Sequence, residues 1–441
     1  MPAIAAALSC VLVERAIAQP VLTDENVLVV YNSAVDGEAG GGGQAIFDFY
    51  RGLFQRDGVL GLDLDDPDLL PGNIAYADFI ARIRNPIRAH LVDNDLTEQV
   101  LVITLTRGIP TRIADVSEGA VGRLSSSLLG DRPNDASDAF NADNATFASV
   151  DSELALLFQD LEAGENGGAF DSPADNYIRN PFFDSNESIA ASDRSTVQTA
   201  RRFATSGSHQ VLRAIRGNLQ TPNDTRPLFL TCRLDGDSVQ DVIFLISRAQ
   251  NIYIDPATDA FIIDEFDPGA GGPDVSGQEL DAGGLSATVR SIDAGGDFDQ
   301  LAGDLGNAGF AQVRFDEGAD FLIGDNGSIA DPSRSPVAGP IAAVFTLGGN
   351  ASTQNQNGYL NTYIDNATGQ TQFVRGAYFS SVESYNARAF GGLPQFSDQG
   401  SVAEFIAAGG TFGVGTVFEP LTLGVNEVDI LVDRHLFEDM T

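Results

Sequence analysis

The chain has 441 residues with 43% apolar side chains, enough to bury a core, so global disorder is excluded. Its 62 acidic and 25 basic residues give a net charge of −37, which makes nucleic acid a poor partner because the phosphates would be repelled. No stretch of about 20 apolar residues occurs, so we expect no membrane span. Two cysteines exclude a disulfide framework and a cysteine-rich metal site.

All 25 basic residues are arginine. An acidic, lysine-free surface is typical of halophilic proteins, which stay soluble in salty water where salt screens their self-repulsion. GC-rich codon usage would favour the same residues. Composition alone therefore leaves both interpretations open.

An apolar run near the N-terminus, Ala3–Val13, is followed by Ala16-Ile17-Ala18. This pattern is typical of a signal-peptide core with an Ala-x-Ala cleavage site. A basic region is missing, and Glu14-Arg15 follows the run, so an ordinary buried segment is the alternative. We favour a signal peptide over residues 1–19, and hence an extracellular or cell-envelope location.

Short β-rich apolar runs alternate with helical stretches, which predicts an α/β fold with a mostly parallel sheet flanked by helices. The predicted strands are Val27–Tyr31, Val59–Leu64, Val100–Leu105, Leu228–Cys232, Ala260–Ile263, Ile341–Phe345, Gly376–Phe379 and Val414–Phe418. The predicted helices are Gln44–Gln55, Ile74–Leu91, Val150–Leu161, Val239–Gln250, Phe298–Leu305 and Val402–Ala408. Pro86 should break or kink the second helix.

A Gly- and Asp-rich segment, residues 267–296, is the predicted linker between two α/β halves. The halves are residues 20–266 and 297–441. Two polar stretches, 114–147 and 163–226, contain few periodic apolar positions and are predicted to be long insertions in the first half.

Polar residues at the ends of the predicted strands are the candidates for ligand binding, because ligands of open parallel sheets bind beyond the carboxyl ends of the strands. We expect these residues to gather along one rim. Arg107 and Arg233 would clamp a carboxylate or phosphate, which predicts a peptide or other anionic ligand. Arg and Asp at strand ends also pair simply to fix loops, so each residue has a structural alternative. The candidate ligand-binding residues are Asn32, Ser33, Arg107, Arg233, Asp235 and Asn350.

Asp235, Glu383 and Glu419 are candidate ligands for a hard cation such as Ca²⁺, or candidate acid–base groups. No other cofactor is predicted. The run Gly40–Gly43 precedes the first helix but lacks the Lys-Ser/Thr of a P-loop and the spaced glycines of a dinucleotide fold. We interpret it as a hinge.

The order of several segments resembles that of a large uncharacterised family of exported bacterial α/β proteins. The matching segments are VLVVYNS (27–33), TRGIP (106–110), SVDSELALL (149–157) and TCRLDG (231–236). The resemblance runs from about residue 26 to the end, with the two polar stretches poorly matched. Members of that family continue past the position of Thr441, which implies that this chain is truncated at its C-terminus.

The second half is also distantly similar to caspase- and gingipain-type cysteine peptidases, which implies a caspase/flavodoxin-like sheet. Their pattern places a His near Gly348–Asn350 and a Cys near Ser380–Ser384, and neither residue is present there. Because that chemistry needs a thiolate–imidazole pair, the resemblance implies a degenerate, non-catalytic relative. The alternative is a hydrolase in which Ser381 or Ser384 is the nucleophile and Glu383 the base. Whether the chain is an enzyme stays open at this point.

Overall fold

The structure, a computed structural model, describes most of the predicted strands and helices. The described residues are 23–35, 41–54, 57–114, 148–155, 157–158, 204–206, 209–211, 213–215, 225–227, 229–250, 252–264, 297–316, 321–324, 334–346, 360–365, 367–381, 386–387, 390 and 401–415. The predicted signal peptide, the linker 267–296 and the greater part of the insertion 114–147 lie outside them. Within the insertion 163–226 the described elements are short strands.

A first sheet of four parallel strands occupies the N-terminal half, in the order β11-β4-β1-β2. Its strands are β1 (Val27–Tyr31), β2 (Leu60–Asp63), β4 (Val102–Thr106) and β11 (Leu230–Leu234). Helix α1 (Gly43–Phe54) packs on one face, where Phe47 stacks on Tyr31 at a centroid distance of 4.7 Å. Helices α2 (Tyr76–Phe79), α3 (Asn85–Asp93) and α6 (Val150–Ala155) cover the other face.

A second sheet of five parallel strands, in the order β13-β12-β16-β17-β18, is formed by the later part of the chain and includes one strand that precedes the predicted linker. Its strands are β12 (Ala260–Asp264), β13 (Val313–Asp316), β16 (Ile341–Thr346), β17 (Phe373–Ser381) and β18 (Phe412–Val414). Helix α9 (Asp297–Asn307) packs on one face. Helix α10 (Val402–Ala407) and the 3-10 turn η4 (Leu360–Tyr363) pack on the other.

The two sheets share a strand order. Numbered in chain order within each sheet, both begin 2-1-3-4, because the second strand lies on one side of the first and the third strand on the other. The end of β4 therefore corresponds to the end of β16. In each sheet the second strand is added on one side of the first strand and the later strands on the other side. The strand order therefore reverses between β1 and β4 in the first sheet and between β12 and β16 in the second.

Short strands complete the described chain. They form the sheet β3-β5-β6 and the pairs β7-β8, β9-β10 and β14-β15. Their bounds are β3 (Asn73–Ala75), β5 (Arg112–Ala114), β6 (Ala148–Ser149), β7 (Ala204–Ser206), β8 (His209–Val211), β9 (Arg213–Ile215), β10 (Thr225–Pro227), β14 (Phe321–Gly324) and β15 (Arg334–Val337). A 3-10 turn, η1 (Asp24–Asn26), precedes β1.

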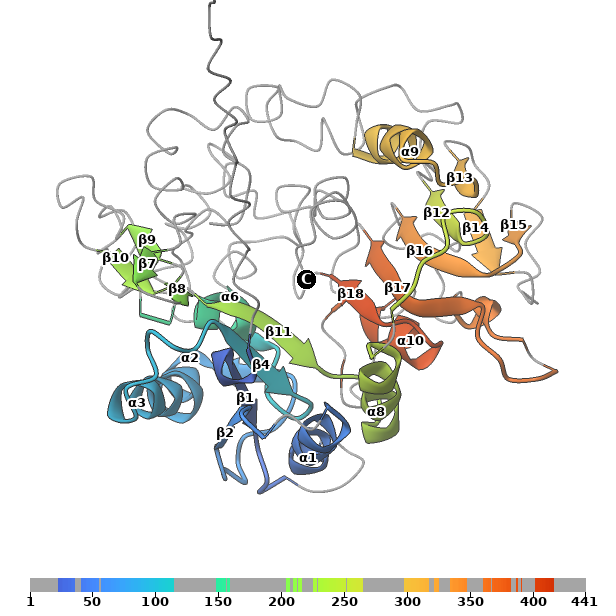
Figure 1. Cartoon of the computed structure of the whole chain (residues 1–441). Coiled ribbons are helices and arrows are strands. Elements are labelled where there is room, and N and C mark those ends of the chain that lie inside the picture. Colours follow the sequence, from blue (N-terminus) through green and yellow to red (C-terminus); the bar gives the residue numbers. More distant parts are fainter. Residues whose placement is uncertain are drawn as a thin grey trace, which may run out of the picture.

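Helix α8 (Val239–Arg248) joins the halves, because it follows the last strand of the first sheet and contacts both α1 and α10 (Figure 1). Its Val242 lies in the same buried cluster as Ile46 of α1 and as Ile262 and Phe379 of the second sheet. One of the buried apolar clusters is therefore shared by the two halves.

The predicted α/β fold is confirmed, and each of the eight predicted strands overlaps an observed one. The strands divide between two sheets, so the expected single rim is two separate edges. The second predicted helix is continuous, but it changes from α-helical to π-helical over Ile80–Arg84, directly before α3, and Pro86 stands in the first turn of α3. No helix in the described part of the chain is long and apolar enough to cross a membrane.

Candidate functional site

The carboxyl edge of the first sheet is closed by Arg107, which follows β4 and is fully buried. Its Nε donates to the carbonyl of Gly236, its Nη1 to that of Gly41 and its Nη2 to that of Asp237, at 3.2, 2.6 and 2.9 Å. One guanidinium thus ties together the chain that follows β1, β4 and β11. The predicted anion clamp would need these bonds to be given up.

Arg233 of β11 is engaged in the same way. Its Nε donates to both carboxylate oxygens of Asp151, at 3.0 and 2.8 Å, and its Nη1 donates to Asp235 Oδ2 at 3.2 Å and to the carbonyl of Ile109 at 2.9 Å. Its Nη2 donates to the carbonyl of Pro110. The structural alternative weighed for Arg233 and Asp235 is therefore the arrangement found.

Asp235 is 2% exposed, and its Oδ1 accepts from the amide of Gly236 at 2.9 Å. Both of its oxygens are engaged by the chain, so its surroundings do not support the predicted metal role. Burial raises the pKa of Asp235 to about 6, against the opposing influence of Arg233. The folded state therefore holds this proton more tightly than the unfolded chain does.

The raised pKa of Asp235 should be visible in the pH dependence of the free energy of unfolding. Because the pKa is higher in the folded state, the contribution of Asp235 is greatest below about pH 4 and is lost as pH rises through about 6. The free energy of unfolding of the natural protein, minus that of Asp235→Asn, should fall by roughly 2–3 kcal/mol between about pH 4 and pH 7. Urea denaturation across this range measures the difference. Parallel pH curves for the two proteins would contradict the assignment.

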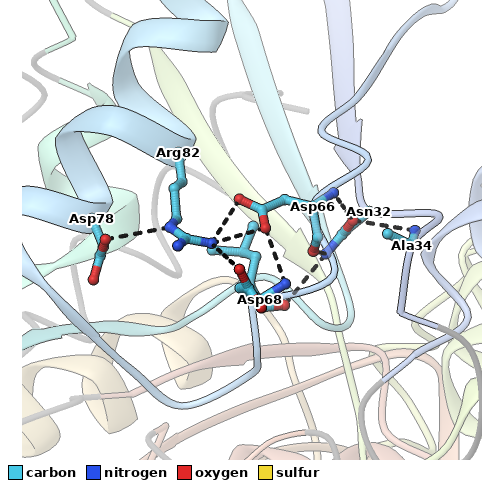
Figure 2. Close-up of polar contacts among 7 residues, drawn as sticks. Asn32, Ala34, Asp66, Asp68, Asp78 and Arg82 are labelled. Atoms are coloured by element: carbon cyan, nitrogen blue, oxygen red, sulfur yellow. Dashed lines mark hydrogen bonds and ion pairs between the residues drawn. The ribbon is translucent and has the colours of Figure 1, made fainter.

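Asn32 and Ser33 fix the loops beyond β1 rather than facing open space. Asn32 is 2% exposed, and its Nδ2 donates to the carbonyl of Asp66 at 2.8 Å while its Oδ1 accepts from the amides of Asp66 and Ala34 (Figure 2). Arg82 in turn binds the Asp66 carboxylate (Figure 2). Ser33 donates its amide and hydroxyl to the carboxylate of Asp63.

The carboxyl edge of the second sheet is built differently. Register pairs join Asp316 to Asp264, Asp264 to Thr346, and Thr346 to Ser381, so four polar residues stand in one row across β13, β12, β16 and β17. Neighbouring strands lie about 4.8 Å apart. Because side chains two positions apart in a strand share a face, three of the four continue the apolar face of Ile262, Val344 and Phe379.

The row is buried. Asp264 and Thr346 are 0% exposed and Ser381 is 1% exposed. Among the described residues, neither the Thr346 Oγ1 nor the Ser381 Oγ has a hydrogen-bond partner. Asp264 Oδ2 accepts from the amide of Leu322 at 2.6 Å. Burial and, second, the Asp264 charge raise the pKa of Tyr363, which places this phenol near the carboxylate.

Ser381 was a candidate from the sequence, whereas Asp264 and Asp316, which each come last in their strand, were not. Asn350, Glu383, Ser384 and Glu419 lie outside the described residues, so their predicted roles and the Ca²⁺ site stay predictions. Over the part of the chain that the structure describes, no group of three or more His, Cys, Asp or Glu is placed to hold a metal ion.

No family model, curated protein or solved structure matches the chain. The geometry of the two sheet edges is therefore the basis for inferring function.

Proposed function

We propose that the protein is a non-catalytic binding protein whose second sheet takes a polar ligand, such as a peptide segment, at its carboxyl edge. The unpartnered, buried hydroxyls of Thr346 and Ser381 carry this proposal. A buried polar group without a partner costs about 1–3 kcal/mol. Polar groups of a ligand would remove that cost.

The position of the row supports the same conclusion. Asp264 ends β12 and Thr346 ends β16, the two strands between which the strand order reverses. Ligands of open parallel sheets bind at such points, because the loops diverge there. In the first sheet the three donor groups of Arg107 at the equivalent edge are already bonded to backbone carbonyls.

The spacing along the row disfavours catalysis by Ser381. A general base must approach the nucleophile to about 3 Å. Asp264 stands two strands away from Ser381, roughly 10 Å at the usual strand spacing. The neutral Thr346 lies between them. A hydrolase would therefore depend on Glu383, which lies outside the described residues.

The ligand class follows from the charge of the row. Asp264 and Asp316 are acids on neighbouring strands, which disfavours the anionic ligand predicted from the sequence. Hydroxyls both donate and accept hydrogen bonds. A ligand that donates to a carboxylate and also exchanges hydrogen bonds with hydroxyls fits best, and a peptide backbone has both kinds of group.

Peptides that bind the natural protein can be selected from a pool of short peptides and labelled with a fluorophore. Fluorescence anisotropy then measures their affinity. Thr346→Val and Ser381→Ala should each weaken the selected peptides about 3- to 10-fold, as expected for one lost hydrogen bond. Thr104→Val, in the first sheet, removes a hydroxyl outside the row and should leave binding unchanged. Equal affinity in all four proteins would rule the edge out as the site.

The hydrolase alternative is tested by covalent labelling with a fluorophosphonate, read by intact mass. We expect no labelling of Ser381, since no described base reaches it. Stoichiometric labelling that Ser381→Ala abolishes would show an activated serine and overturn the non-catalytic proposal.

A further inference from the structure

The start of helix α1 forms a second polar position, at the edge of the first sheet. The helix has 12 residues and begins at Gly43, and the amide of Ile46 donates to the carbonyl of Gly42. The amides of Gly43, Gln44 and Ala45 precede this bond and have no partner within the helix. No acidic residue lies in the first turn. The positive end of the helix dipole is therefore not neutralised by its own side chains.

The hydroxyl of Thr106 is aimed at this helix start. Thr106 ends β4, is 0% exposed, and its Oγ1 has no hydrogen-bond partner among the described residues. A Cβ placed on Gly43 would lie 2.8 Å from that Oγ1 and 3.2 Å from the backbone nitrogen of Asn32. Gly43 thus lets the first turn of α1 approach an unpartnered, buried hydroxyl.

The surrounding charge and the topology favour an anion. The guanidinium of Arg107 donates to the carbonyl of Gly41, two residues before the helix. Helix α1 starts between β1 and β4, where the strand order of the first sheet reverses. Asp235 and Asp237 also lie near Arg107 and oppose an anion. Binding should therefore be modest and should weaken as salt screens the attraction.

We propose that this position binds a phosphate group. The first amides of α1 and the Thr106 hydroxyl supply its hydrogen bonds, and Arg107 supplies positive charge while remaining bonded to its three carbonyls. Helix N-termini bind phosphate through these same amides and the helix dipole. Gly43, the last of the four glycines, then allows the start of α1 to lie close to Thr106. The sequence alone favoured a hinge at these glycines.

The probes are inorganic phosphate, phenyl phosphate and acetate, compared by calorimetric titration at constant ionic strength, since salt alone screens a chain of charge −37. The natural protein should bind one or both of the first two and should bind acetate at least about tenfold more weakly. Binding of inorganic phosphate alone points to the free ion, and preference for phenyl phosphate points to an ester. Acetate binding as tight as that of phosphate would overturn the phosphate assignment.

Gln44→Glu separates binding from folding. A carboxylate at the second residue of a helix interacts favourably with the positive end of the helix dipole. The variant should therefore fold at least as well as the natural protein. It should weaken phosphate binding at least about tenfold, because two like charges would lie a few ångströms apart. Gln300→Glu adds the same charge to α9, which packs on the second sheet, and should leave binding unchanged. Equal loss in both variants would reduce the effect to net charge and overturn the site.

A matched pair of variants tests the role of the Thr106 hydroxyl. Thr106→Val should weaken phosphate binding several-fold, whereas Thr104→Val, two residues earlier on the same face of β4, should not. The Thr104 hydroxyl already has a partner, since it donates to or accepts from Cys232 Sγ at 3.2 Å. Full phosphate affinity in Thr106→Val would remove Thr106 from the site.

Discussion

Replacing Arg107 with alanine is expected to destabilise the fold by more than about 3 kcal/mol, because each of three carbonyls loses a charged donor at about 1–3 kcal/mol. The three carbonyls belong to Gly41, Gly236 and Asp237, so the loops beyond three strands lose their common link. Chemical denaturation followed by circular dichroism measures the loss.

Two further variants make the Arg107 prediction specific. Arg107→Lys keeps the charge but has no planar fork, so it should recover only part of the stability. Arg82→Ala removes a half-exposed arginine that pairs with Asp66 and should have a much smaller effect. If Arg107→Ala lost no more unfolding free energy than Arg82→Ala, Arg107 would not have the proposed role of linking the three loops.

Phe379→Ala should cost about 3–5 kcal/mol, the usual range for a fully buried phenylalanine. Phe379 is 0% exposed in β17 and stacks on Phe405 of α10 at 5.2 Å between ring centroids. It belongs to the cluster that α8 shares with the second sheet, so the truncation should loosen the contact between the halves. Denaturation midpoints of the purified variant provide the measurement.

Phe244→Ala is the matched control for this truncation. Phe244 lies on α8 and is 52% exposed, so its removal should change stability by about 0.5 kcal/mol or less. Comparable losses in the two variants would show that the shared cluster does not stabilise the fold as described.

The sequence predicted the buried strands well because they are nearly continuous apolar runs. Strand β13 was missed, since its segment Val313–Asp316 alternates apolar and charged residues and lies at the edge of its sheet. An alternating run of four residues does not stand out from the polar segments around it. The sequence predicted two α/β halves but a single rim, and it placed β12 in the first half, because strand pairing depends on contacts that no local pattern encodes.

The candidate site shows the same limit. Arg107 follows a strand as a ligand-binding arginine would. Only its bonds to three backbone carbonyls show that it links the loops of the first sheet. Asp264 was missed because the predicted strand ended at Ile263, one residue too early. The register that brings Asp264, Thr346 and Ser381 into one row joins segments far apart in the chain. No spacing in the sequence predicts it.

The shared strand order makes the two edges directly comparable. Thr106 and Thr346 end the corresponding strands, and both hydroxyls are buried without a partner among the described residues. In the first sheet the start of α1 and the side chain of Arg107 lie beside this position. In the second sheet, the row continues through Ser381 toward the edge strand β18.

A crystallographic soak of the full chain with small amides, alcohols and amines tests the proposed binding edge most directly. We predict electron density for a bound molecule within hydrogen-bond distance of Thr346 Oγ1 or Ser381 Oγ, and its loss in crystals of Thr346→Val with Ser381→Ala. Bound molecules that gather elsewhere on the protein, with no density at this row, would contradict it.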